Sequence, residues 1–232
     1  TVPPERRARD RAAADGRRAG EGGVGCDLGI RREDESGLAI SVKGLVEADW
    51  LTLLVQNEAG YLNLMRLVSR AHLDFKVGSL ASLPLAELVG NTAGLLALVG
   101  GTGSGVARLL GVGQGPAAAH QLERLQAAFD GRLYVELQRH GEDAQQRIEE
   151  PLIDLAYQRS LPLVATNDVH FPKRAMYEAH DVLLCIEQGA HIEDPNRRRL
   201  TPGRSHLTDN LSLFHGKMTR HRWASVRTPN PW

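Results

Sequence analysis

The chain has 232 residues, 42% of them hydrophobic, and a formal net charge of zero from 28 basic and 28 acidic side chains. These values are ordinary for a soluble globular protein and give no global electrostatic case for nucleic-acid binding. No apolar run is long enough to cross a membrane, and the Arg-rich N-terminus lacks the apolar segment of a secretory signal. Cys26 and Cys185 match no disulfide or metal motif, so a reducing cytoplasm is the expected location.

Composition divides the chain into three parts. Residues 1–23 hold few large apolar side chains and many glycines, which predicts a mobile lead-in. Residues 24–210 carry the regular patterns of a truncated folded domain. Residues 211–232 are basic, contain no acidic side chain and show no apolar periodicity, which predicts a disordered tail.

Apolar runs and turn residues predict alternating strands and helices in the first half. Strands are expected at residues 24–30, 49–55 and 94–99, with a return strand at 38–42. Helices are expected at residues 58–73, 106–110 and 116–129, with a helical turn at 85–89. Asn57 is the expected N-cap of the first helix, whose predicted inward positions are Tyr61, Leu64, Met65, Leu67 and Val68. The helix that ends near Phe129 is expected to bury Leu122, Leu125 and Phe129.

The second half continues the alternation. Residues 132–138 alternate as in a strand with one covered and one polar face, and residues 161–165 read as a short buried strand. A helix at 144–159 has Ile148, Leu152 and Leu155 on one stripe, and Pro151 should kink it or mark its start. Another helix fits residues 173–186. Repeated strand and helix patterns favour a parallel α/β architecture, as a barrel or an open sheet.

Two potential metal ligands follow the strand at 161–165. Asp168 and His170 are two residues apart, so in extended backbone both side chains face one cation. The alternative is an ordinary turn after a strand, which Asn-Asp also favours.

Other polar residues have both functional and structural interpretations. The glycine run at 100–105 lacks the endings of phosphate-binding loops, so a turn after a strand is favoured. His140 is expected on the surface, with a place at the barrel mouth as the alternative, and His180 is expected to be a structural partner of Asp181. The basic run at 197–199 is expected to be solvated, with a contact to DNA as the alternative.

Four blocks in order carry a family resemblance: LTLLVQNEAGYLNLMRLVS at 51–69, YVELQRHG at 134–141, LVATNDVHF at 163–171 and EAHDVLLCI at 178–186. From about residue 24 to 200 the chain resembles the N-terminal PHP (polymerase and histidinol phosphatase) domain of bacterial DNA polymerase III α subunits. The resemblance implies an incomplete distorted (βα)7 barrel of the PHP type. It also implies a fragment of a longer DNA-directed DNA polymerase, a nucleotidyltransferase whose palm catalytic residues this chain lacks.

The resemblance also implies a degenerate metal site. Asp168 and His170 match the family's last ligand pair, and Asp27 stands where the family often has a ligating Glu. Trp50 and Gly101 stand where metal-binding members have His and Cys. Asp27, Asp168 and His170 are therefore the expected remnant, with a weakly bound divalent metal (Zn, Mn or Mg) and no catalytic residue.

Three functions compete. The first is a polymerase fragment in which this domain is a structural platform. The second is a metal-dependent phosphoesterase or 3′–5′ exonuclease of the PHP superfamily, which the missing ligands disfavour. The third, compatible with the first, is a module that binds other polymerase III subunits, among them the proofreading exonuclease subunit. The parent protein would contact DNA, and no membrane partner is expected.

Overall fold

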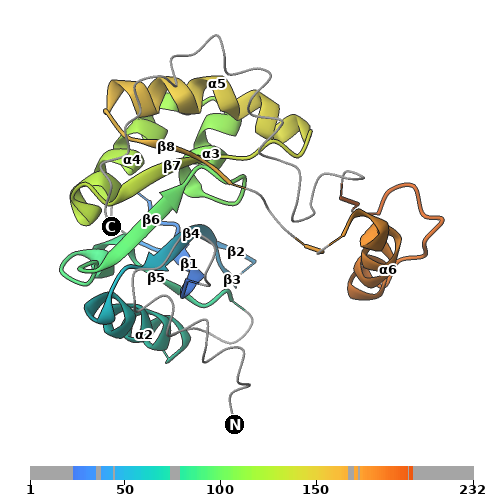
Figure 1. The fold of residues 1–232 in the computed structure, drawn as a ribbon, viewed down its shortest axis with the longest axis horizontal. Helices are drawn as coiled ribbons and strands as arrows, with labels where there is room; N and C mark the ends of the chain where they lie inside the picture. The colour runs from blue at the N-terminus through green and yellow to red at the C-terminus, as the bar shows by residue number, and fades with distance from the viewer. Residues whose placement is uncertain are drawn as a thin grey trace. The chain divides into compact units, whose positions relative to one another are not determined.

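The computed structural model describes residues 23–34, 38–43, 45–73, 79–166, 170–171, 173–197 and 199–200 (Figure 1). These residues form two compact units that divide between Tyr134 and Val135. Apart from Gly23, the expected lead-in and tail lie outside the described residues. None of the helices in the described part of the chain is long and apolar enough to span a membrane.

The sheet of the first unit combines four strands in the order β5-β1-β4-β6. Their bounds are β1 (Gly25–Arg31), β4 (Ala48–Val55), β5 (Ser82–Leu83) and β6 (Leu95–Val99). β1 is antiparallel to β4 and β4 is antiparallel to β6, whereas β1 and β5 are parallel. The α/β class is thus confirmed, but the expected parallel arrangement is wrong for β1, β4 and β6. No described helix lies between β1 and β4, and antiparallel neighbours need no crossover helix.

A short hairpin lies between β1 and β4. It pairs β2 (Ser41–Val42) with β3 (Leu45–Val46), and Glu33 forms a single bridge with Ala39. The return strand expected at 38–42 is therefore reduced to two residues, and its partner is β3. β4 instead occupies the place beside β1, with seven paired positions from Gly25–Leu54 to Arg31–Ala48.

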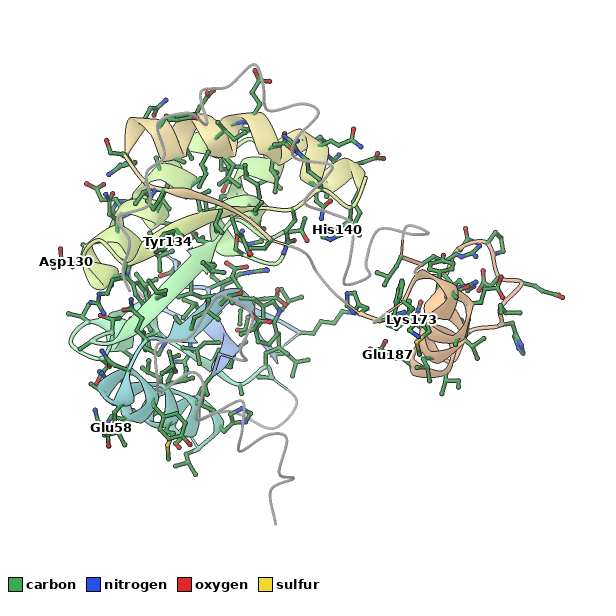
Figure 2. All side chains as sticks on the ribbon, in the orientation of Figure 1. Glu58, Asp130, Tyr134, His140, Lys173 and Glu187 are labelled. Carbon is green, nitrogen blue, oxygen red and sulfur yellow. The ribbon has the colours of Figure 1, made fainter. Side chains whose placement is uncertain are left out.

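Helix α2 (Glu58–Leu73) has the predicted bounds and the predicted cap, because the Gly60 N–H donates to Asn57 Oδ1 at 3.0 Å. Figure 2 labels Glu58 at its first turn. Its predicted inward face is only partly correct. Leu64 and Leu67 are buried, but Tyr61 and Met65 are 45% and 49% exposed. The remaining buried positions of α2 are the small residues Gly60 and Ala71.

Three more helical elements complete the first unit: η1 (Leu85–Leu88), α3 (Gly105–Gly111) and α4 (Gly115–Phe129). α3 and α4 pack on each other, and in the view of Figure 1 they lie above the strands while α2 lies below. Leu122, Leu125 and Phe129 are almost fully buried, which confirms the predicted inward face of α4.

Strand β7 (Leu133–Leu137) crosses the boundary between the units, since its first two residues belong to the first unit and the other three to the second. In the second unit β7 pairs in parallel with β8 (Leu163–Ala165). α5 (Asp143–Gln158) buries Ile148 and Leu152 and runs continuously through Pro151, so Pro151 does not mark its start. The expected polar face of β7 is wrong at Glu136, which is only 7% exposed.

η2 (Arg174–Met176) and α6 (Tyr177–Gln188) follow β8. α6 has a small core of its own, in which Leu184 meets Phe171 and Leu200, and Tyr177 packs against them. The Tyr177 hydroxyl donates to the Leu200 carbonyl at 2.9 Å, which ties the segment after α6 to its first turn.

Candidate functional site

Asp27 lies on an exposed face of the β1–β4 pair. It is paired with Thr52, whose hydroxyl donates to Asp27 Oδ1 at 2.6 Å. Side chains two residues apart on a strand share a face, so Trp50 lies on the same side as Thr52 and Asp27. Trp50 is 41% exposed. The fold thus brings Asp27 and Trp50 to one surface, as the family resemblance implies.

The Trp50 indole packs against the glycine-rich turn before α3. The backbone N–H of Trp50 donates to the Gly103 carbonyl at 2.9 Å, and a Cβ at Gly103 would lie 3.0 Å from indole Cδ1. The Gly101 carbonyl accepts from the Ser104 N–H, and Ser104 Oγ caps α3 by accepting from the Ala107 N–H. The interpretation of residues 100–105 as a turn is therefore confirmed. Indole offers only an N–H donor, so Trp50 cannot ligate a metal.

Cys26, next to Asp27, keeps its proton more firmly than an ordinary thiol. Burial raises the pKa of the Cys26 thiol, and the neighbouring Asp27 carboxylate adds to the increase. A thiol with a raised pKa forms little thiolate at neutral pH and is a poor nucleophile and metal ligand.

The other two expected ligands belong to the second unit. Asp168 lies outside the described residues, whereas His170 is described and exposed. The His170 ring centre lies 5.3 Å from that of His180, and the His180 ring centre lies 5.4 Å from that of Phe171. Among the described residues, no three His, Cys, Asp or Glu side chains form a group that could hold a metal.

In the second unit, two polar contacts lie near the C-terminal ends of strands β7 and β8. Glu136 accepts a hydrogen bond of 2.9 Å from Thr166, the residue that follows β8. His140 is only 2% exposed, which makes its predicted surface position wrong. Gln145 explains this burial, because its side chain bonds both the His140 N–H at 2.7 Å and His140 Nδ1 at 2.8 Å. His140, labelled in Figure 2, therefore has a structural role in the turn before α5.

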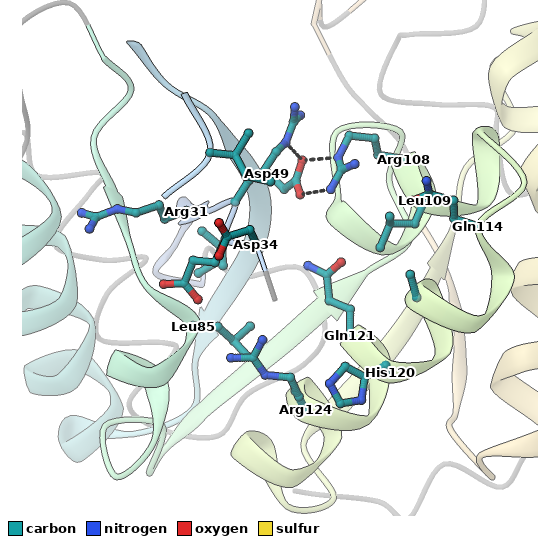
Figure 3. A pocket seen from close by; sticks show the side chains of 15 residues that line it. Arg31, Asp34, Asp49, Leu85, Arg108, Leu109, Gln114, His120, Gln121 and Arg124 are labelled. Carbon is teal, nitrogen blue, oxygen red and sulfur yellow. Dashed lines mark hydrogen bonds and ion pairs between the residues drawn. The ribbon is translucent and has the colours of Figure 1, made fainter. Parts of the chain in front are cut away.

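A cavity of about 750 Å³ opens between β1, the residues Glu33, Asp34 and Ile40, and helices α3 and α4 (Figure 3). At its edge the Asp49 carboxylate receives two hydrogen bonds of 2.9 Å from Arg108 and one of 2.7 Å from Arg32. In Figure 3, Gln121, His120 and Arg124 extend from α4 on the side opposite Asp34. The cavity therefore has acidic and basic walls, and its buried carboxylate is already neutralised by two guanidinium groups.

A second buried ion pair stabilises α6. Both guanidinium NH groups of Arg197 donate to the Asp181 carboxylate at 2.6 Å, and the Arg197 side chain is 1% exposed. The hydrogen bonds from Arg197 hold the pKa of Asp181 below its usual range, against the opposite effect of burial. The expectation of a solvated basic run is thus wrong for Arg197, although the Arg199 side chain is 53% exposed.

The pairs around Asp49 and Asp181 were not predicted from the sequence. Arg108 follows Asp49 by 59 residues and Arg197 follows Asp181 by 16, so neither pair has a helical or strand spacing. The only local signal was that Asp49 and Asp181 each interrupt an apolar pattern at a position that the fold buries. A buried carboxylate requires a partner, but the sequence does not indicate which arginine supplies it.

Comparisons with known proteins identify a family and several relatives of this chain. The model of the PHP domain family matches residues 21–140. The DNA polymerase III α subunit of Caulobacter vibrioides is 43% identical over 174 residues, which cover 72% of this chain and 15% of that protein. The α subunit of Vibrio cholerae is 37% identical over 147 residues, 63% of this chain and 13% of its own length. That of Thermus aquaticus is 33% identical over 151 residues, 64% of this chain and 12% of its own length.

The chain thus spans about one seventh of these relatives or less. The family match includes α2, the turn beside Trp50, and the paired strands β1 and β4 that carry Asp27 and Trp50. The chain belongs to the PHP domain family, and the relatives that it matches are DNA polymerase III α subunits.

Proposed function

We propose that this chain is the PHP portion of a replicative DNA polymerase III α subunit and serves as a structural or subunit-binding platform with a degenerate metal site. The similarity to three α subunits supports the parent activity, DNA-directed DNA synthesis, and we propose that it takes place in the cytoplasm. We further propose that the strands belong to an incomplete, distorted (βα)7 barrel. The proposed partners of such a platform are other polymerase III subunits, in particular the proofreading exonuclease subunit.

The position of Trp50 carries this proposal. β4 presents the indole on the same face as Asp27, and the indole packs on the Gly103 turn. A donor-only aromatic side chain therefore occupies the position at which the resemblance implies a metal-binding His. A hydrolytic zinc centre needs three protein ligands and an open position. Asp27, Asp168 and His170 remain as the proposed remnant set, able to bind Zn²⁺, Mn²⁺ or Mg²⁺ weakly.

Primer extension tests the parent activity and its absence from this chain. The purified chain is expected to add no nucleotide to a primed template, because no palm-type aspartate cluster is present in its sequence. A matched α subunit of full length is the positive control. Incorporation by the chain above the level of a no-enzyme control would contradict the proposal.

Metal titration and phosphate release test the remnant site. Calorimetry with Zn²⁺ and Mn²⁺ is expected to give weak binding, lost in Asp168→Ala and in His170→Ala, without phosphate release from a phosphomonoester or from DNA. Submicromolar binding with turnover that Asp168→Ala abolishes would favour the phosphoesterase function instead. Subunit binding is tested separately by gel filtration of the chain with the exonuclease subunit of the same organism, for which co-elution is expected.

A further inference from the structure

We propose that the outer side of helix α2 binds the same side of α2 in a second copy of this chain, with the two helices antiparallel. Helix α2 packs against the sheet through Gly60, Leu64, Leu67 and Ala71, which are its buried residues. Its outer side carries four large apolar side chains, here called the α2 stripe. They are Tyr61, Leu62, Met65 and Leu73, which are 45%, 54%, 49% and 82% exposed.

The residues of the α2 stripe lie together on one face of the helix. Positions three, four, seven, eight or eleven apart share a helix face, and Met65 follows Leu62 by three and precedes Leu73 by eight. Tyr61 lies four residues before Met65 and extends the same face. Single exposed apolar residues are ordinary on a protein surface, whereas a contiguous apolar face marks an interaction surface. The α2 stripe is therefore a candidate interface.

The charges at the two ends of the helix indicate what covers this face. Helix α2 is acidic in its first turn, at Glu58, and basic in its last turn, at Arg70 and His72. Arg70 already forms an ion pair of 2.7 Å with Glu87, so His72 supplies the basic end beside the stripe. Figure 2 labels Glu58, which is exposed at the opposite end. In an antiparallel pair each acidic end meets a basic end, and the two helix dipoles also oppose each other.

A two-fold axis beside Met65 gives suitable neighbours along the whole stripe. Residues at equal distances before and after Met65 then face each other across the two copies. Glu58 precedes Met65 by seven residues and His72 follows it by seven, so a carboxylate meets an imidazole. Tyr61 and Ser69 are each four residues away, so a large ring meets a small exposed side chain. The flexible methionine at the axis adapts to its own copy.

The size of the stripe predicts a weak, reversible dimer. A stable interface has about 20–30 residues on each side, whereas the stripe offers four large apolar side chains framed by Glu58, Ser69 and His72. Dimerisation therefore depends on concentration and exchanges rapidly. This role goes beyond that of a platform for other subunits and does not rest on it, because the occupant is a second copy of this chain.

Sedimentation equilibrium of the full 232-residue chain, at concentrations up to about 0.1 mM, tests the dimer. The average mass is expected to rise from monomer towards dimer. Met65→Asp places two carboxylates at the axis and should raise the dissociation constant at least about tenfold, since like charges in an interface repel. Met176→Asp is the matched control, a methionine of the second unit with 44% exposure, and it should leave the dissociation constant unchanged. Circular dichroism monitors folding.

A charge exchange tests the antiparallel register with two exposed positions that the fold does not need. Glu58→Lys and His72→Glu each bring like charges or lose the attraction across the axis, and each should weaken the dimer by about threefold or more. The double variant restores opposite charges in the antiparallel pair and should recover the original dissociation constant. In a parallel pair each residue meets its own copy, so the double variant would show no recovery.

Each outcome either supports the dimer or overturns it. A monomer at every concentration, or a dimer that a folded Met65→Asp variant retains at full strength, would overturn the proposal. Lack of recovery in the double variant would overturn the antiparallel arrangement. A monomeric chain whose binding to the exonuclease subunit is lost in Met65→Asp would assign the stripe to that subunit instead. A dimer that binds no polymerase subunit would count against the platform role alone.

Discussion

Asp49 in the first unit and Asp181 in the second are both buried carboxylates in two-point contact with an arginine, yet their arginines differ. The side chains of Arg108 and Arg32 around Asp49 remain 34% and 25% exposed. Arg197 beside Asp181 is 1% exposed. The first pair therefore retains contact with water on its cationic side, whereas the second is enclosed on both sides.

The cores around the two pairs explain why the enclosed pair matters more. β4, which carries Asp49, is paired on both sides and buries Leu51 and Leu53 almost completely. α6, which carries Asp181, has a core cluster of three buried residues, joined by Tyr177. A small core buries little apolar surface and leaves a narrow stability margin. We infer that the geometry of the α6 segment depends on the Asp181–Arg197 pair far more than β4 depends on Asp49.

Removal of the enclosed cation is expected to have the largest effect. Arg197→Met keeps much of the side-chain volume but leaves the Asp181 carboxylate buried without its main partner. Amide exchange across α6 should accelerate by at least about tenfold. Arg199→Met is the control: its side chain is 53% exposed and lies 3.4 Å from Asp181, so exchange should change little. Equal effects of the two variants would show that the buried Arg197 contributes no more to α6 than the exposed Arg199.

Acid should weaken the same pair without any mutation. The hydrogen bonds from Arg197 lower the pKa of Asp181 in the folded chain, so the unfolded chain binds this proton more readily. The stabilisation is then complete above about pH 4 and is lost as pH falls through the lower folded pKa. Carboxyl NMR should show Asp181 titrating below the usual aspartate range. Arg197→Lys, which keeps the charge but not the two-point contact, should move the titration upward. An unchanged midpoint in that variant would rule out hydrogen bonding as the cause.

In the first unit, a change in the close packing around Asp49 is expected to lower the free energy of unfolding more than a change in the charge around it. A Cβ at Gly105 would lie 2.3 Å from Gln121 Nε2 and 2.7 Å from Asp49 Oδ2. Gly105→Ala must therefore displace Gln121 and disturb the carboxylate, and we expect a loss of about 1–3 kcal/mol in unfolding free energy. Gly115→Ala, at the open first turn of α4, should be neutral or slightly stabilising. Urea denaturation followed by amide exchange in α3 and α4 compares them; equal stabilities would show that the site relaxes freely.

Local patterns predicted the elements better than the faces that they bury. The bounds of α2 follow from Asn57 and the helical spacing after it, which are signals within one turn. Its buried face was mispredicted because large apolar side chains were taken as inward. A Cβ at Gly60 would lie 1.8 Å from the Gly94 carbonyl oxygen, so α2 approaches the β6 entry through a glycine. This close approach turns Tyr61 and Met65 outward, and apolar periodicity does not register it.

The sequence indicated residues that a strand register brings to one face, but it did not indicate the long-range ion pairs. The family resemblance placed Asp27 and Trp50 in one site, and the β1–β4 register brings them to one face. The two arginine partners of Asp49 come from two separate segments, so no spacing in the sequence reveals them. Strand order was also missed, since apolar runs indicate buried strands but carry no direction. The connection from β1 to β4 contains no described helix, whereas α2 lies between β4 and β6, so the helical pattern alone does not reveal that β4 is antiparallel to both neighbours.

The smallest effect is expected at the N-terminal cap of α2, where Asn57 makes a neutral hydrogen bond. This cap contrasts with the enclosed Asp181–Arg197 ion pair. The Gly60 N–H donates to Asn57 Oδ1, and Asn57→Ala removes this acceptor at a cost of about 1 kcal/mol. Because the cap is local to α2, exchange should accelerate in the first turn of α2 but not in α6. Asn57→Asp retains the acceptor and adds a favourable charge at the helix N-terminus, so it should restore protection. Loss of protection in Asn57→Asp equal to that in Asn57→Ala would mean that the amide contributes through packing against Gly94 and not through the cap.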